Sequence, residues 1–361
     1  MKISVIFGTR PEIIKLSPLI RLFEEKKVDY FIIHTNQHFS FLMDKVFIDE
    51  LNLPSPKYHL GLNGVKNHGE MVARMLIKIE KILLKEKPDL VIVQGDTNTT
   101  LAGALSASKL GIKLVHIEAG LRSYDRSMPE EINRVVTDHL SDFLFAPTKK
   151  QKEILINEGI DKNKIFVVGN TIVDALDENL KIALKNKKLI QKYKNKNYFL
   201  LTLHRPSNVD VKEKLEKIFF VLEQLIDKYQ TPIIFPIHPR TRSKINEFKL
   251  KIDSKKIVIV EPFSYLEMLL AEKFAKLILT DSGGLQEEAC ILKVPCVTLR
   301  DNTERPETLE VGANILLSLD DKNFFDKIEK ILTKEKNWKN PFGEKVTKKI
   351  FNILNEKNKY E

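Results

Sequence analysis

Short runs of apolar residues alternate with longer amphipathic stretches in the first half of the chain. The apolar runs are 3–7, 30–34, 89–93, 113–117, 143–146 and 165–168, and most end at a polar or glycine-containing turn. The stretches between them, such as 68–84 and 97–110, have the apolar spacing of helices. Because the runs are apolar for most of their length, they predict parallel strands covered by helices on both faces.

The same alternation resumes in the second half, with apolar runs at 198–203, 232–237, 257–260, 277–279 and 295–299. The segment 170–197 grades from a helical pattern into Lys/Asn-rich sequence, which is typical of a joint between domains. We therefore predict an α/β protein with two Rossmann-like, doubly wound domains, 1–169 and 170–339, facing a cleft. A basic helical segment, 340–361, is expected to return to the first domain.

The charge of the chain does not predict a nucleic-acid partner. The formal net charge is +10, from 59 basic and 49 acidic residues. Lysines and glutamates are interspersed, as in 24–27 and 85–87, and no basic stripe carries aromatic residues. A solvated Lys/Glu surface explains this composition better.

The two cysteines and the N-terminus indicate the compartment. Cys290 and Cys296 lack a familiar metal-ligand spacing, so we expect no metal and two buried thiols in a reducing compartment. Met1-Lys2 leads straight into an apolar strand, without a signal-peptide pattern or a bilayer-length apolar run. We therefore expect a cytoplasmic protein with no membrane partner.

The stretch 280–307 carries the features of an anion site. An apolar strand runs into Asp281-Ser282-Gly283-Gly284 and then a helical pattern, and Glu304-Arg305 follows the next strand. Unpaired N–H groups and the helix dipole favour an anion there, and glycines allow a phosphate to approach the backbone. The alternative is a tight strand-to-helix connection without a ligand.

Six polar residues directly follow apolar strands: Arg10, Asp96, Glu118, His204, His238 and Ser282. Ligands of open α/β sheets bind at the carboxyl ends of the strands, so two facing halves would gather all six around one cleft. Structural alternatives remain for some of them. Asp96 could be a helix N-cap, Glu130 and Glu131 suit the first turn of a helix, and a strand-end histidine is often structural.

Several motifs, in this order, resemble the non-hydrolysing UDP-N-acetylglucosamine 2-epimerases. They are Gly8-Thr9-Arg10-Pro11-Glu12, Gly95-Asp96-Thr97, 116–122, 129–134, Gly169-Asn170-Thr171, His204-Arg205, 281–288 and 303–307. The resemblance implies a glycosyltransferase-B-like fold. It also implies interconversion of UDP-N-acetylglucosamine and UDP-N-acetylmannosamine through a 2-acetamidoglucal, without metal or nicotinamide, by a homodimer.

The resemblance also implies roles for individual residues. Asp96, Glu118, Glu130 and His204 would carry the acid–base chemistry. The substrate would be bound by Arg10, Lys15, His238, Phe263, Met268, Ser282, Gly283, Gly284, Glu288 and Arg305. A second, activating substrate molecule, known in bacterial members, would involve Gln37, His38 and Arg74. One departure is Ser207, which stands where relatives commonly have a glutamate.

Three alternatives stay open. The same reaction on another sugar, such as UDP-2,3-diacetamido-glucuronate, is disfavoured by the retained Gly-Gly-x-Gln series at 283–286. A glycosyltransferase on the same fold would need at most one base, whereas Asp96, Glu118 and Glu130 suggest proton shuttling; turnover without an acceptor would distinguish the two. A non-catalytic binding protein would show affinity for the nucleotide sugar but no turnover.

Overall fold

Internal contacts divide the chain into two compact units. The computed structural model describes residues 1–37, 41–62, 65 and 67–357. The N-terminal unit comprises Met1–Glu178 and Phe342–Glu361, and the C-terminal unit comprises Asn179–Pro341. The sequence placed the boundary after residue 169, just before helix α7 (Ile172–Ala183), whereas the contacts divide the chain within that helix.

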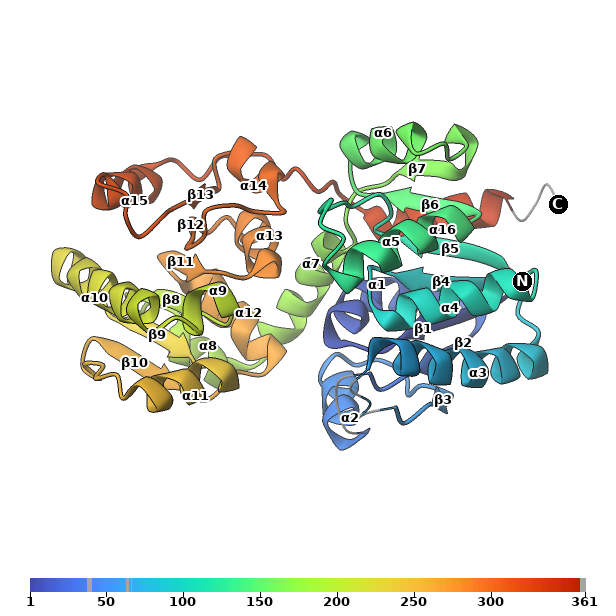
Figure 1. Cartoon of the computed structure of the whole chain (residues 1–361), viewed down its shortest axis with the longest axis horizontal. Helices are drawn as coiled ribbons and strands as arrows, with labels where there is room; N and C mark the ends of the chain where they lie inside the picture. The colour runs from blue at the N-terminus through green and yellow to red at the C-terminus, as the bar shows by residue number, and fades with distance from the viewer. Residues whose placement is uncertain (38–40, 63–64, 66, 358–361) are drawn as a thin grey trace. The chain divides into compact units, whose positions relative to one another are not determined.

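Within the described residues, the N-terminal unit contains a parallel sheet of seven strands, in the order β3-β2-β1-β4-β5-β6-β7 (Figure 1). The strands are β1 (Lys2–Phe7), β2 (Asp29–His34), β3 (Tyr58–His59), β4 (Leu90–Gln94), β5 (Lys113–Ile117), β6 (Phe143–Ala146) and β7 (Ile165–Val167). The six predicted strands are present. Strand β3 was not predicted, because two residues are too few to show an alternation.

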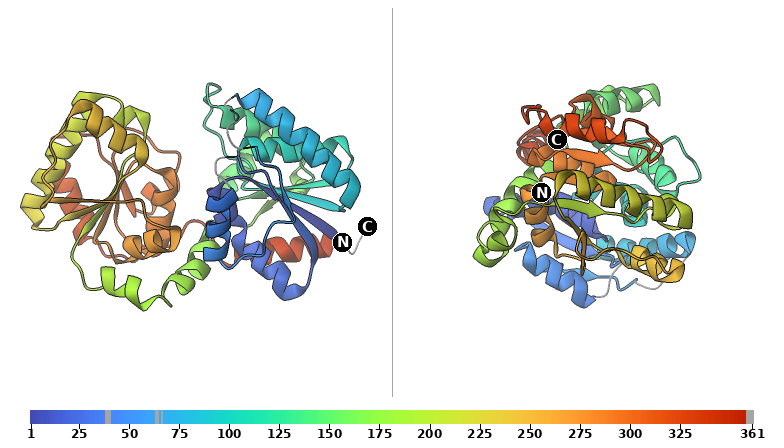
Figure 2. Two further views of the ribbon diagram at one scale, coloured as in Figure 1. Left: turned by 90° about the horizontal axis from the view of Figure 1, so that it is seen from below. Right: turned by 90° about the vertical axis from the view of Figure 1, so that its left-hand side faces the viewer.

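Helices cover both faces of this sheet. They are α1 (Arg10–Lys26), α2 (Phe41–Glu50), α3 (His68–Glu86), α4 (Asn98–Lys109), α5 (Pro129–Leu140), α6 (Lys149–Asn157), the 3₁₀ turn η1 (Lys162–Lys164), α7 and α16 (Val346–Lys357). The left panel of Figure 2 shows α3 and α4 on one face and α1 and α16 on the other. Helix α3 buries a stripe of every fourth residue, from Met71 and Met75 to Leu83, against the sheet.

The C-terminal unit, whose residues are all described, contains a parallel sheet in the order β10-β9-β8-β11-β12-β13. The strands are β8 (Phe199–Thr202), β9 (Ile233–Pro236), β10 (Ile257–Val260), β11 (Leu277–Thr280), β12 (Cys296–Thr298) and β13 (Asn314–Leu316). The five predicted strands are present. The edge strand β13 was missed because its three residues begin with a polar asparagine and are only partly apolar.

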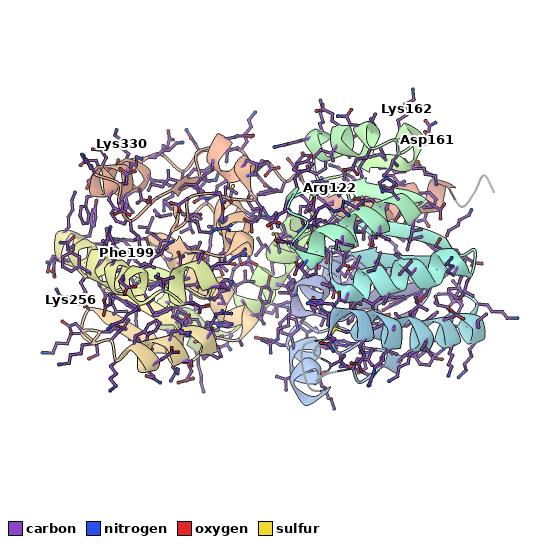
Figure 3. All side chains as sticks on the ribbon, in the orientation of Figure 1. Arg122, Asp161, Lys162, Phe199, Lys256 and Lys330 are labelled. Carbon is purple, nitrogen blue, oxygen red and sulfur yellow. The ribbon has the colours of Figure 1, made fainter. Side chains whose placement is uncertain are left out.

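The helices of the C-terminal unit enclose a second core. They are α8 (Lys187–Tyr193), α9 (Pro206–Val209), α10 (Lys212–Tyr229), α11 (Pro239–Phe248), α12 (Tyr265–Phe274), α13 (Gly283–Leu292), α14 (Pro306–Glu310) and α15 (Phe324–Thr333). Phe199 lies in this core, whereas Lys162 and Lys330 are solvent-exposed, as expected for a lysine-rich surface (Figure 3).

The strand order of each sheet reverses once, which confirms the doubly wound α/β prediction. In the N-terminal unit the reversal lies between β1 and β4, and in the C-terminal unit it lies between β8 and β11. The loops that follow these four strands begin with Gly8, Gly95, Leu203 and Asp281. Doubly wound sheets bind ligands where the strand order reverses, so a ligand site is expected at these loops.

The C-terminal segment completes the N-terminal unit, as predicted for 340–361. Helix α16 packs against α1 (Figure 1). The N–H of Asn170 donates to the Phe342 carbonyl oxygen at 2.8 Å, and the N–H of Thr347 donates to the Asp174 carboxylate at 2.6 Å. Gly169 precedes this junction with a φ of 105°, and a Cβ there would lie 2.5 Å from the Phe342 carbonyl oxygen.

Two further features of the described residues bear on the sequence-based expectations. Cys290 and Cys296 are buried free thiols, as predicted. Burial raises the pKa of the Cys290 thiol to about 12, so it is not a reactive thiolate. No helix in this part of the chain combines the length and apolarity needed to cross a bilayer.

We expect Gly169→Ala to destabilise the N-terminal unit by about 3 kcal/mol, because it adds a backbone clash to an unfavourable φ. Gly159→Ala is the matched control. Gly159 has a φ of 88° but open space around the added methyl group, so we expect a loss of about 1 kcal/mol. Urea unfolding followed by circular dichroism measures both. Equal losses would mean that the Phe342 contact does not restrict residue 169.

Candidate active site

The carboxylate of Glu12 joins two strand-end loops of the N-terminal unit. It is buried and accepts hydrogen bonds from the N–H groups of Gly8 at 2.8 Å and Thr9 at 2.7 Å, and from the Thr97 hydroxyl at 2.6 Å. Burial raises the pKa of Glu12, although these donors oppose the rise. The N–H groups before α1 therefore already have an anionic partner, and the loop carrying Arg10 is tied to the loop carrying Asp96.

Asp96 lies between β4 and α4 and is not the helix N-cap. The N-cap is Thr97, whose hydroxyl accepts from the Thr100 N–H. The alternative that Asp96 serves as the N-cap of this helix is therefore wrong. The Asp96 carboxylate accepts from Nη2 of Arg134 at 2.6 Å and from Nε at 3.0 Å. Asn133 donates to the Asp96 carbonyl oxygen. The carboxylate is therefore held by α5, with 30% of the side chain exposed to solvent.

Glu118 directly follows β5, the strand adjacent to β4. Its carboxylate accepts from Lys15 Nζ at 2.5 Å and from Gln94 Nε2 at 2.6 Å, and the residue is only 7% exposed. The Glu118 backbone has a φ of 74°. This conformation costs a residue other than glycine about 1–3 kcal/mol, and such strained residues cluster at functional sites. The structure thus brings together Lys15 and Glu118, two predicted site residues that are 103 positions apart in the chain.

Glu130 and Glu131 have different surroundings. Glu131 is buried and accepts from the N–H groups of Ser123 and Tyr124 and from Arg134, so it holds the loop before α5. Burial opposes its ionisation, but these hydrogen bonds lower the pKa of Glu131. Glu130 is half-buried, and its carboxylate has no hydrogen-bond or ion-pair partner among the described residues. A structural role therefore belongs to Glu131, and Glu130 is available for chemistry.

A buried polar network fixes the strand that carries Glu118. His116 lies between two oxygens: its Nε2 donates to the Gly95 carbonyl at 2.8 Å, and its Nδ1 is 2.6 Å from the Asp138 carboxylate. Arg122, labelled in Figure 3, pairs with Asp138 at 2.7 Å and with Glu158 at 2.6 Å. The loop before Asp96 and the end of β5 are thereby held in register.

The remaining predicted residues of the N-terminal unit lie near α2 and α3. The Arg10 guanidinium lies 5.4 Å from the ring centroid of Phe47. Gln37 is buried, and its Oε1 accepts from the backbone and hydroxyl of Thr99. Arg74 forms a surface ion pair with Glu70, and His38 lies outside the described residues.

In the C-terminal unit, Asp281 has the linking role that Glu12 has in the N-terminal unit. It is fully buried after β11 and accepts from the N–H groups of His204 at 3.1 Å and Arg205 at 2.9 Å, and from the Asn208 amide at 3.2 Å. Burial opposes ionisation, but the hydrogen bonds lower the pKa of Asp281. The loops after β8 and β11 are thus joined by one carboxylate.

The two predicted histidines of this unit lie side by side. His204 Nδ1 is 3.1 Å from Asp281 Oδ1, which orients the imidazole ring. The ring centroids of His204 and His238 are 5.6 Å apart. His238 is exposed, and its Nδ1 accepts from the Arg240 N–H as the N-cap of α11. Burial, together with the nearby His204 and Arg240, lowers the pKa of His238.

The start of α13 is the best anion site of the C-terminal unit. The Ser282 hydroxyl does not cap the helix, and a Cβ at Gly284 would meet only the Ser282 hydroxyl, at 3.9 Å. A Cβ at Gly283 would lie 2.9 Å from the Glu304 carboxylate, which itself pairs with Arg205 and Arg300 at 2.8 Å each. A carboxylate thus already lies beside the helix terminus, between two guanidinium groups, so the position favours an anion.

The other predicted binding residues surround α13 and α12. Arg305 Nε is 3.0 Å from the Glu287 carboxylate, and Glu288 is the next residue of α13. Phe263 is half-buried, with its ring 5.8 Å from that of Tyr193, and Met268 lies in the first turn of α12. Ser207, the departure from the family pattern, is exposed on α9.

Sequence reasoning gave no separate role to several residues that organise these clusters: Glu12, Gln94, Arg134, Arg205 and Arg300. Arg134 and Glu12 stand in quoted motifs, but their partners are far away in the chain. Asp281 carried the same signal as Glu118, an acid directly after a buried strand, and could have been singled out on that ground. Gln94 gave no signal, because it is the last residue of an apolar strand.

The geometry defines a class of protein. One Rossmann-like unit presents carboxylates at the ends of two adjacent strands, and the other presents an arginine-rich anion site at a helix N-terminus. These are the features of a glycosyltransferase-B-like α/β protein.

Comparisons with known proteins identify the family. The family model described as UDP-N-acetylglucosamine 2-epimerase matches residues 21–355. A UDP-N-acetylglucosamine 2-epimerase from Methanocaldococcus jannaschii is 61% identical, over 98% of this chain and 99% of its own. A UDP-2,3-diacetamido-2,3-dideoxy-D-glucuronate 2-epimerase from Pseudomonas aeruginosa is 43% identical, over 88% of each chain.

Among solved structures, that of the Methanocaldococcus jannaschii UDP-GlcNAc 2-epimerase in complex with UDP-GlcNAc and UDP is similar to this chain. Its TM-score is 0.87 at 61% identity, covering 99% of this chain and 100% of that one. The chain therefore belongs to the UDP-N-acetylglucosamine 2-epimerase family.

We expect Asp281→Asn to lower the free energy of unfolding by about 3 kcal/mol at pH 7, because several hydrogen bonds to a buried charge are weakened. The pKa of Asp281 is lowered in the folded state, so its contribution is present above its ordinary value of 3.8 and is lost as the pH falls through the lowered pKa. The difference between wild type and variant should therefore shrink in acid.

Urea unfolding between pH 3 and pH 7 measures this difference. Asp227→Asn is the control, because Asp227 pairs with Lys256 at the surface and should change stability little. A difference that does not depend on pH would show that the Asp281 charge is not what holds the two loops.

Proposed function

We propose that the protein is a non-hydrolysing UDP-N-acetylglucosamine 2-epimerase, which interconverts UDP-N-acetylglucosamine and UDP-N-acetylmannosamine. The observation that carries the proposal is the pair Asp96 and Glu118 at the ends of adjacent strands, in a chain whose α13 also begins without a side-chain cap, beside arginines. Membership of the family and the 61% identity to a relative of that name support it.

The chemistry of the substrate explains why several acid–base groups are needed. The hydrogen at C2 of the sugar has no adjacent carbonyl group to acidify it. If the C2 proton is removed while the C1–O bond breaks, the bonding electrons leave with UDP and a C1–C2 double bond forms in 2-acetamidoglucal. The epimer forms when a proton is added to C2 from the opposite face and the UDP oxygen bonds again to C1. Both steps balance without an added reactant.

The acid–base groups of this scheme are assigned to the N-terminal unit. Asp96, Glu118 and Glu130 exchange protons with C2, and the carboxylates of the first two are positioned by ion pairs with Arg134 and Lys15. Glu130 has no such partner among the described residues. The different surroundings of these carboxylates suit groups that take and return a proton on two faces of one carbon.

UDP binding is assigned to the C-terminal unit. The diphosphate binds at Ser282, Gly283 and Gly284, with Arg305 and His238 nearby, and His204 assists at the leaving oxygen with its ring oriented by Asp281. Glu288 accepts from the ribose hydroxyls, and Phe263 and Met268 contact the uracil. Arg10 and Lys15 of the N-terminal unit are also assigned to substrate binding.

Proton NMR in deuterated water tests the function. The purified protein is mixed with UDP-N-acetylglucosamine and a chelator, without cofactor or acceptor. We expect UDP-N-acetylmannosamine carrying deuterium at C2. An unchanged substrate would contradict the proposal, and turnover of UDP-2,3-diacetamido-glucuronate instead would favour the activity named for the 43% identical relative.

Asp96→Asn and Glu118→Gln should each lower turnover by roughly two or more powers of ten, while UDP binding persists. Asp161→Asn is a control, because Asp161 is an exposed N-cap of η1 and asparagine also caps helices. Coupled assays of turnover and calorimetry with UDP measure the two effects separately. Near-normal turnover of either variant would remove that residue from the mechanism.

The resemblance to the family also supports a cytoplasmic homodimer. We expect sedimentation velocity of the purified protein to give twice the mass of the 41.7 kDa chain. A species with the mass of one chain at working concentrations would contradict the dimer, and would leave the proposed reaction unaffected.

A further inference from the structure

Gln286, the last residue of the Gly-Gly-x-Gln series, is a buried polar residue to which neither the acid–base scheme nor the nucleotide contacts above give a role. It lies on α13, one turn after Gly283, and is fully buried. Burying an amide without hydrogen-bond partners is costly. The partners of the Gln286 amide therefore show which parts of the protein it holds.

The Gln286 side chain contacts segments that are distant in the chain. Its Nε2 donates to the carbonyl oxygen of Ser282, in the turn before α13, at 3.2 Å. Its Oε1 accepts from the Thr303 hydroxyl at 2.5 Å and from Nδ2 of Asn314, on β13, at 3.1 Å. One amide thus joins the start of α13 to the loop after β12 and to the edge strand of the sheet.

The same hydrogen-bond network holds the backbone of Arg305 on both sides. The Thr303 hydroxyl accepts from the Arg305 N–H at 3.0 Å, and the Thr308 hydroxyl donates to the Arg305 carbonyl oxygen at 2.8 Å. Thr308 in turn accepts from Nδ2 of Asn314 at 3.1 Å. Arg305 has a φ of −125° and a ψ of 58°, outside the regions of helices and strands, so these contacts rather than regular secondary structure hold its backbone.

The two segments joined by Gln286 are those that the proposed function assigns to the UDP diphosphate. Ser282 directly precedes α13, and the Arg305 guanidinium lies beside this helix, with its Nε 3.0 Å from the Glu287 carboxylate. Without the amide, three polar groups would each lose a hydrogen-bond partner, and the loop would lose this attachment to the helix.

We propose that Gln286 is a positioning residue that holds the loop of residues 303–305 against the start of α13 and thereby fixes the Ser282 turn and Arg305 relative to each other for UDP. The inference rests on the proposed function, because that function assigns UDP to these two segments. Binding groups must be held to within roughly 0.5 Å of their productive positions, which requires a supporting set of hydrogen bonds behind them. Gln286 provides such support for both segments at once.

A purely structural role is the alternative, since a buried and well-partnered amide also stabilises the fold. The two roles differ in how the effects of substitutions combine. If Gln286 acts through Thr303, removing either partner breaks the same link, so the two effects on UDP affinity should not add.

A double-mutant cycle in UDP affinity tests this link. Gln286→Met keeps a similar volume and removes the amide, and Thr303→Val keeps the shape and removes the hydroxyl. We expect calorimetry at pH 7 to show UDP binding about tenfold weaker for each variant, and about tenfold rather than hundredfold weaker for the two changes together. Thr303→Ser, which retains the hydroxyl, should bind UDP as wild type does.

Thr231→Val is the matched control. Like that of Thr303, the Thr231 hydroxyl donates to a carbonyl oxygen, that of Tyr229 at 3.0 Å, and accepts from an N–H donor, Nδ2 of Asn197 at 3.1 Å. Thr231 lies just before β9, at the opposite edge of the sheet. This variant should also be less stable in urea unfolding, but it should keep wild-type affinity for UDP at a temperature where circular dichroism shows every variant folded.

Steady-state kinetics separates nucleotide binding from chemistry. The contacts assigned to UDP hold it in the substrate complex as well as in the transition state. Gln286→Met should therefore raise KM for UDP-N-acetylglucosamine about tenfold and leave kcat within about twofold. A lower kcat at unchanged KM would contradict a role in holding the nucleotide.

The remaining outcomes are distinct. Wild-type affinity in folded Gln286→Met, or additive losses in the double variant, would overturn the positioning role and leave the proposed function standing. Equal weakening of UDP binding by Thr231→Val would also overturn it, because it would show a general effect of lost stability. If wild type does not bind UDP, the proposed function fails and this inference fails with it.

Discussion

A buried carboxylate that accepts backbone N–H groups holds each ligand-facing edge of this protein together. In the N-terminal unit it is Glu12, which ties the loop after β1 to Thr97 in the loop after β4. In the C-terminal unit it is Asp281, which ties the loop after β8 to the end of β11. Both lie where the strand order reverses, so two loops that would otherwise diverge are fixed by one charge. The positions of Asp96 and His204 depend on these links.

The two carboxylates also explain how the two similar sheets differ in chemistry. Glu12 accepts from the N–H groups of Gly8 and Thr9 just before α1, so these two donors are not offered to a phosphate. The start of α13 has no side-chain cap from Ser282, and guanidinium groups surround it. The same strand-turn-helix arrangement is therefore closed by an acidic side chain in one unit and flanked by arginines in the other.

The fold class and most strands could be predicted from the sequence, because buried parallel strands are continuous apolar runs. It missed β3 and β13, edge strands of two and three residues. The family resemblance located Glu118 and Lys15. The Glu118 carboxylate is oriented by a hydrogen bond from Gln94 and by the left-handed backbone at Glu118, and the motifs show neither. Such links join residues distant in the chain, and no local pattern encodes them.

The return of the C-terminal segment to α1 makes the N-terminal unit discontinuous in the chain. Its sheet is synthesised before the C-terminal unit, but α16 and the Phe342 junction that completes it are synthesised after that unit. The C-terminal unit, continuous from Asn179 to Pro341, can fold while the surface of α1 still lacks its cover. The N-terminal unit can therefore be completed only after the C-terminal unit has been synthesised, and a chain cut before α16 would have an incomplete first unit and a complete second one.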